Sequence, residues 1–140
     1  MIEIPNEVRE QMLAEAQREY PNEACGLLAG RVVVEDGRTD ARADRFFAMR
    51  NADASPASYR LDPREQLDVF TRIDEEGLEL VAIYHSHTHS EAYPSETDRS
   101  LAFYPEAHYV LVSLEDHDVP VVRAFTIRDG VIDEQEVRAG

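Results

Sequence analysis

Three histidines alternate in the stretch from Ile83 to Asp98, which reads IYHSHTHSEAYPSETD. They are His85, His87 and His89, and an apolar run precedes them directly. On a β-strand every second side chain points to the same face, so His85 and His87 would lie about 6.5 Å apart along the strand. Two imidazoles at that spacing can converge on one metal ion, whereas a helix would place them on different faces.

A third metal ligand could be His89, by period alone, or Asp98. Asp98 lies three residues after Ser95, a residue type that often begins a helix as its N-cap, and its carboxylate would then lie close to the strand end. Two histidines and one carboxylate, with a fourth position left for water, are a common ligand set for catalytic zinc. Ser-x-x-Asp is also a variant capping box, so this pair could serve only to cap a helix.

A hydrolytic metal site also needs a residue that carries a proton. The candidates are Glu23, Glu91 and Glu96, and Glu96 is expected to face solvent on a short helix. Glu23 precedes the apolar segment 24–34, where a low dielectric would raise the pKa of an acid. The alternative interpretation of Glu23 is an exposed loop acid after Pro-Asn.

The hydrophobic pattern predicts the elements that hold these residues. In chain order we expect an edge strand at 2–4, a helix at 5–20, strands at 24–34 and 41–51, a short strand at 58–62, a helix at 63–76, a strand at 78–87, a helix at 95–104, a strand at 108–115, and a hairpin at 120–139 that turns at Asp129-Gly130. Asp62 and Glu65 form a capping box, and Leu67, Phe70 and Ile73 supply the buried stripe of the helix that follows. Residues 1–140 should form one α/β domain, a mixed sheet flanked by about three helices.

The composition excludes several classes of protein. Apolar residues make up 43% of the chain, but no segment reaches the ~20 apolar residues of a membrane helix. The charged start is unlike a signal peptide, so we expect a cytoplasmic protein. With 29 acidic and 14 basic residues the net charge is −15, which repels nucleic acid and anionic membranes. The acids are scattered, as on a solvated surface, although they could also steer a basic partner.

The remaining candidate residues have simpler interpretations. Cys25 is the only cysteine, which excludes an internal disulfide and a cysteine-cluster metal site. It is expected to be a small core side chain. His108 and His117 have no motif around them and are expected to be surface or sheet residues.

The spacing of these residues resembles a known family. His-x-His, seven residues, Ser, two residues and Asp is the signature of the JAMM (MPN+) metalloproteases, and here it comprises His85, His87, Ser95 and Asp98. The family also has a glutamate before an apolar, glycine-containing strand, which corresponds to Glu23 in NEACGLLAG. The resemblance covers nearly the whole chain and implies the MPN (JAB1/MPN, cytidine-deaminase-like) fold.

The resemblance also implies a role for each motif residue. His85, His87 and Asp98 would bind Zn²⁺. Glu23 would accept a proton from the attacking water and deliver it to the leaving amine, and Ser95 would donate a hydrogen bond to the oxyanion. Because the family pattern has no ligand at the position of residue 89, that histidine is expected to be a loop residue near the cleft.

The short chain and its loop SEAYPS are most similar to bacterial members that act on ubiquitin-like sulfur carriers. This implies hydrolysis of an amide or isopeptide bond at the Gly-Gly tail of such a carrier, with cysteine as a candidate leaving group. The loop 49–62 is a reasonable edge for the tail. The alternatives are a deubiquitinase-like isopeptidase on other conjugates and a non-catalytic MPN-type binding module, although such modules typically lack the metal ligands. A zinc deaminase is disfavoured because its motif needs more than one cysteine.

Overall fold

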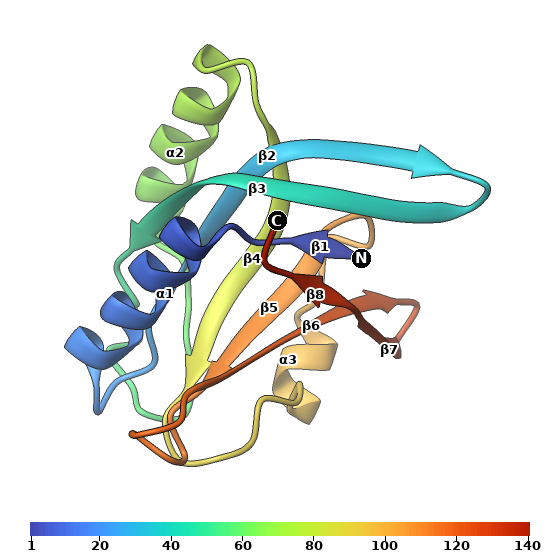
Figure 1. The fold of residues 1–140 in the computed structure, drawn as a ribbon. Coiled ribbons are helices and arrows are strands. Elements are labelled where there is room, and N and C mark those ends of the chain that lie inside the picture. The colour runs from blue at the N-terminus through green and yellow to red at the C-terminus, as the bar shows by residue number, and fades with distance from the viewer.

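The computed structural model describes residues 1–140, which contain eight strands and three helices (Figure 1). In chain order these are β1 (Ile2–Glu3), α1 (Asn6–Glu19), β2 (Cys25–Glu35), β3 (Arg38–Met49), α2 (Pro63–Glu75), β4 (Glu79–His87), α3 (Glu96–Ser100), β5 (His108–Ser113), β6 (Val121–Arg128), β7 (Val131–Gln135) and β8 (Val137–Arg138). None of the helices has both the length and the apolar character needed to cross a membrane.

All eight strands belong to one mixed sheet, in the order β7-β6-β5-β4-β2-β3-β1-β8. β4 and β5 are parallel, β1 is parallel to both β3 and β8, and the remaining pairs are antiparallel. The apolar run that precedes the histidines forms β4, between β2 and β5. The C-terminal end of β4 is therefore supported by a neighbouring strand on each side.

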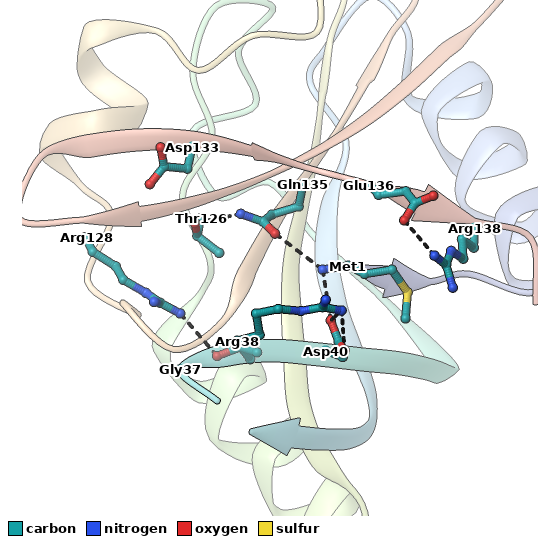
Figure 2. A pocket seen from close by; sticks show the side chains of 11 residues that line it. Met1, Gly37, Arg38, Asp40, Thr126, Arg128, Asp133, Gln135, Glu136 and Arg138 are labelled. Atoms are coloured by element: carbon teal, nitrogen blue, oxygen red, sulfur yellow. Dashed lines mark hydrogen bonds and ion pairs between the residues drawn. The ribbon is translucent and has the colours of Figure 1, made fainter. Parts of the chain in front are cut away.

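The sheet curls until its two ends come close together. β7 and β8 stand at opposite ends of the strand order, yet only Glu136 separates them along the chain. At this closure the Met1 ammonium lies 3.3 Å from Gln135 Oε1 and 3.3 Å from Asp40 Oδ1 (Figure 2). A polar hollow of about 360 Å³ lies here, and none of the predicted site residues lines it.

Each face of the sheet has its own apolar core. On one face, Val8 and Met12 of α1 pack against strand residues such as Tyr84. On the other face, Val69 and Ile73 of α2 pack against a cluster that includes the β2 residues Cys25, Leu27 and Ala29. Burial of each large aliphatic side chain contributes roughly 1.5–3 kcal/mol, so these two layers fix the positions of β2 and β4.

The prediction for α2 was partly wrong. Leu67 is 66% exposed, and Val69 together with Ile73 forms the buried stripe. Asp62 caps the helix as expected, because its side chain accepts hydrogen bonds from two backbone N–H groups of the first turn. Glu65 does not complete a capping box, since its Oε1 accepts the backbone N–H of Arg50 instead.

Two further elements are shorter than predicted. Residues 58–62 form no strand, and only an isolated bridge joins Asn51 and Leu61. The helix predicted at 95–104 ends at Ser100. Beyond it, the Tyr104 N–H donates to the hydroxyl of Tyr109 and not to a helical carbonyl, so a tertiary contact replaces the predicted last turn.

Candidate metal centre

The motif histidines His85 and His87 lie at the C-terminal end of β4, where their side chains are buried. β2 runs antiparallel beside β4 and places Cys25 opposite His85. Both imidazoles are buried, with His85 1% exposed and His87 5% exposed. Between them, Ser86 points to the opposite face of the sheet, where its Oγ accepts the Ala24 N–H at 2.8 Å.

Asp98 approaches this strand end from α3. Ser95 Oγ accepts the Asp98 N–H at 3.0 Å, and Asp98 Oδ2 accepts the Ser95 N–H at 2.9 Å. This reciprocal capping box fixes the direction of the carboxylate. The capping and the metal-ligand interpretations of Ser-x-x-Asp are therefore compatible, because the same oxygen atom also faces the two histidines.

Three side-chain atoms converge at this point. His85 Nε2 and His87 Nε2 lie 3.1 Å apart, and Asp98 Oδ2 lies 3.2 Å from the first and 3.0 Å from the second. In a tetrahedral zinc site with bonds of 2.0–2.1 Å, neighbouring ligand atoms are about 3.3 Å apart. Both the spacing and the donor types of this His-His-Asp group fit a Zn²⁺ ion.

The electrostatics of the group also suit a cation. Burial raises the pKa of the Asp98 carboxyl, but hydrogen bonds from His85 and His87 outweigh burial and hold that pKa well below its ordinary value. Burial lowers the pKa of His85, which favours the neutral imidazole that a metal requires. Burial lowers the pKa of His87, but hydrogen bonds to Asp98 and to the Glu91 carbonyl outweigh burial and raise that pKa. The His87 Nδ1–H donates to the Glu91 carbonyl at 2.8 Å, so Nε2 is the ring nitrogen that faces the other two ligand atoms.

His89 turns away from this group. Its Nδ1–H donates to Thr88 Oγ1 at 2.9 Å, because the Thr88 hydroxyl hydrogen is given to the Pro56 carbonyl. Its Nε2 accepts the hydroxyl of Tyr20 at 3.1 Å. Both ring nitrogens are thus occupied, and His89 lies in an exposed loop outside the converging atoms.

Glu23 lies beside the histidines and is only 6% exposed, so the interpretation as an exposed loop acid was wrong. The antiparallel register of β2 and β4, extended by two residues from the pair of Cys25 and His85, brings it opposite His87. Burial raises the pKa of Glu23 to about 7, an increase that the nearby His87 opposes and the Asp98 charge assists. Its backbone is also fixed, since its N–H donates to the Ser55 carbonyl at 2.9 Å.

The other candidate proton carriers are less suited. Glu96 is exposed, as predicted, and pairs with Arg99 on the outer side of α3. Glu91 is also exposed, and its backbone carbonyl, not its carboxylate, contacts His87. Glu23 is therefore the only one of the three whose side chain is buried beside the ligand group.

The remaining candidates have no contact with the group that would suggest chemistry. Cys25 is a fully buried core residue, as predicted, and burial raises the pKa of its thiol to about 12. His108 is a sheet residue in β5 and His117 is exposed in the loop after it.

The sequence pattern missed two residues that support this centre, Asn51 and Tyr59. The Asn51 Nδ2 donates to the Glu23 carbonyl at 3.0 Å, and the Tyr59 ring stacks on the imidazole of His85. Both belong to the loop 49–62, which was expected to be an edge for the tail of a carrier. Tyr59 also lines a pocket of about 390 Å³ that borders Asp98.

The sequence profile described as prokaryotic homologs of the JAB domain matches residues 5–128. The CysO-cysteine peptidase of Mycobacterium tuberculosis is 47% identical over 126 residues, which cover 90% of this chain and 82% of that protein. A probable TtuB-protein conjugate cleaving protease of Thermus thermophilus is 34% identical over 128 residues, 91% of this chain and 76% of that protein.

The fold matches known structures as well. A solution structure of a protein from Desulfitobacterium hafniense is 37% identical and superposes with a TM-score of 0.87, covering 98% of this chain and 91% of that one. The matched profile bears out the expected JAB/MPN fold, and the structure has the mixed sheet and three helices that were expected.

Proposed function

This chain belongs to the prokaryotic homologs of the JAB domain, and from that membership we propose that it is a zinc-dependent peptidase of ubiquitin-like sulfur-carrier conjugates. The observation that carries the proposal is the convergence of His85, His87 and Asp98 beside a buried glutamate. Relatives named as a CysO-cysteine peptidase and as a TtuB-conjugate protease support hydrolysis of a peptide bond.

In this proposal His85, His87 and Asp98 hold the Zn²⁺ ion. When bound, Zn²⁺ supplies Lewis-acid chemistry, since it polarises a carbonyl and lowers the pKa of water toward ~7. Glu23 accepts the proton of the attacking water and returns it to the leaving amine nitrogen, and its raised pKa near neutrality suits both steps. The Ser95 Oγ accepts the Asp98 N–H, so its own hydrogen is free to donate to the oxyanion.

The pocket beside Asp98 is suited to the carrier's tail. Its lining includes Tyr59, Leu61, Leu101 and Tyr104, so much of its wall is apolar, and Asp98 also lines it. An extended Gly-Gly tail is narrow enough to bring its last carbonyl close to the ligand group. A neutral or basic surface around that tail would match the net charge of −15.

Two leaving groups are consistent with the relatives. Cysteine is our first candidate, because the relative with 47% identity is named for a carrier-cysteine substrate. A protein amine, as in an isopeptidase, is the second candidate, because another relative is named for protein conjugates. A non-catalytic binding module remains a poorer proposal, since such a module has no need of the complete His-His-Asp group.

The direct test is incubation of the zinc-loaded protein with two carriers that differ only in the bond after Gly-Gly. One carries a C-terminal cysteine and the other is joined to a lysine side chain, and mass spectrometry follows the release of each. We expect about one zinc per chain and release from the cysteine carrier. If neither bond is cut by zinc-loaded protein, the peptidase proposal is wrong.

Glu23→Gln tests the proton carrier. The amide keeps the size of the side chain but cannot accept a proton, so turnover should fall by about 10²- to 10⁴-fold while zinc content stays at the wild-type level. The matched control is Glu96→Gln, which changes an exposed acid paired with Arg99 and should leave turnover unchanged. A fully active Glu23→Gln protein would assign the proton transfer to another group.

A further inference from the structure

The two histidines of the centre are oriented by different means. The Nδ1–H of His87 is held by the Glu91 carbonyl, as is usual for a histidine that binds metal through Nε2. The Nδ1 of His85 is buried and has no hydrogen-bond partner. A ring without such a partner is free to tilt about χ2 unless packing holds it. Something other than a hydrogen bond must therefore fix the plane of His85.

Tyr59 covers the face of that imidazole. The two ring centroids lie 4.3 Å apart and the ring planes differ by only 20°, which is a stacked arrangement. Other aromatic pairs of the structure are tilted or edge-on, such as Tyr20 with His89 and Tyr93 with Phe125. Parallel stacking on the Tyr59 ring restricts tilt of the imidazole.

The loop that carries Tyr59 is fixed to the rest of the centre. The amide of Asn51 donates to the carbonyls of Glu23 at 3.0 Å and of Ser58 at 2.9 Å. The Thr88 hydroxyl, next to His87, donates to the Pro56 carbonyl at 3.0 Å. These bonds tie Ser58 and Pro56, which lie just before Tyr59 in the chain, to residues beside His87, so the tyrosine ring has a defined position.

We propose that Tyr59 is a positioning residue for His85, holding by ring stacking the imidazole plane that a hydrogen bond holds in His87. This inference rests on the proposed function in that it takes His85 to be a zinc ligand. Tyr59 also lines the pocket next to Asp98, so the wall of that pocket and the orientation of the ligand depend on one side chain. The hydroxyl of Tyr59 is not needed for this role, because stacking depends on the ring.

The test compares zinc binding of Tyr59→Leu and Tyr59→Phe by competition with a chromophoric chelator. Leucine removes the flat ring, so the zinc dissociation constant should rise about 10- to 100-fold, as for loss of other groups that orient metal ligands. Phenylalanine keeps the ring and should bind zinc as the wild type does. The visible spectrum of the cobalt(II)-substituted proteins should change in the leucine variant alone, because the ligand field senses the imidazole's direction.

Tyr104→Leu is the matched control, since Tyr104 lines the same pocket but makes no contact with His85. It should leave the zinc dissociation constant unchanged. Melting curves of the metal-free proteins show whether each variant is folded. Tyr59→Met, whose longer and more flexible side chain adapts to the space without a flat ring, replaces Tyr59→Leu if that variant is unfolded.

Each outcome decides the inference. Equal zinc affinity in Tyr59→Leu and wild type would overturn it, and so would an equal loss in Tyr59→Phe, which would place the effect in the hydroxyl. A wild-type protein that binds no zinc would instead contradict the proposed function, and the positioning role would fall with it. A wild type that binds zinc but cuts no carrier leaves the metal-affinity comparison valid.

Discussion

One oxygen atom of Asp98 takes part in two kinds of interaction. Oδ2 accepts the Ser95 N–H at the start of α3 and also faces Nε2 of both histidines. Because the helix start already orients the carboxylate, little conformational freedom is lost when a cation binds there. The same arrangement means that a substitution at Asp98 affects both a cap and a ligand.

Asp98→Ala should weaken zinc binding by more than the roughly 10- to 100-fold typical of groups that only orient a ligand. His89→Ala should have little effect, because His89 contacts Tyr20 and Thr88 and lies outside the converging atoms. Chelator competition measures both dissociation constants. Asp98→Asn, which keeps an acceptor for the Ser95 N–H, separates the loss of charge from the loss of the cap. The reverse order of the two alanine variants would make His89 the third ligand.

The site residues differ in how far sequence alone could predict them. His85, His87 and Asp98 lie within one short segment, so a strand end followed by a capped helix is enough to bring them together. Glu23 reaches them only through the pairing of β2 with β4, and its assignment depended on family resemblance. Tyr59 could not be predicted, because its contact arises from a loop whose shape depends on side-chain hydrogen bonds.

At the scale of elements, the bend in β2 shapes the sheet around the site. The register of β2 shifts between Leu28 and Ala29 against β4 and between Ala29 and Gly30 against β3. In both cases the extra residue lies on the partner strand, Val81 in β4 and Asp44 in β3, and such bulges bend the paired strands. Beyond them the outer half of the β2–β3 hairpin extends past the rest of the sheet (Figure 1), and Val34 there is 71% exposed.

Gly30→Ala should destabilise this bend. A Cβ at Gly30 would lie 1.8 Å from the Arg42 carbonyl oxygen, so the two strands would have to separate. We expect a loss of about 1–3 kcal/mol in the free energy of unfolding, measured by urea titration. Arg31→Ala, at the exposed neighbouring position, is the control and should change stability little. Wild-type stability in Gly30→Ala would mean that the bulge absorbs a side chain freely.

Periodicity predicted the elements that bury a regular face, such as α1, β4 and the β6–β7 hairpin. It was wrong where tertiary contacts decide the local structure. The segment 58–62 has strand-like composition, but the Asn51 side chain, not a second strand, satisfies its backbone at the Arg60 N–H and the Ser58 carbonyl. The stripe of α2 was assigned to Leu67 because apolar spacing alone does not indicate which of two apolar faces meets the sheet.

At the scale of the whole molecule, the curled sheet encloses a histidine that the sequence pattern did not mark. His108 is fully buried, and neither of its ring nitrogens has a hydrogen-bond partner. Burial, assisted by the positive charges of the Met1 ammonium and Arg128 and opposed by Asp40, lowers its pKa to about 4.

The closure of the sheet by pairing of β1 with β8 could not be predicted from the sequence, since it joins two-residue strands from opposite ends of the chain.

His108 should make stability depend on pH between about 4 and 6.5. In that range the unfolded chain binds a proton at His108 and the folded chain does not, so stability is complete above pH 6.5 and falls as the pH decreases. The gap between 6.5 and about 4 corresponds to about 3 kcal/mol at 1.36 kcal/mol per pH unit. Urea unfolding at pH 7 and 4.5 should show a smaller difference for His108→Leu than for the wild type. Equal differences would contradict this role of His108.

The buried thiol at the start of β2 has a consequence for an enzyme whose candidate product is itself a thiol. Electrophiles and oxidants attack the thiolate, and Cys25 is both inaccessible and held in its protonated form. Peroxide or disulfide stress would therefore leave the Cys25 thiol untouched.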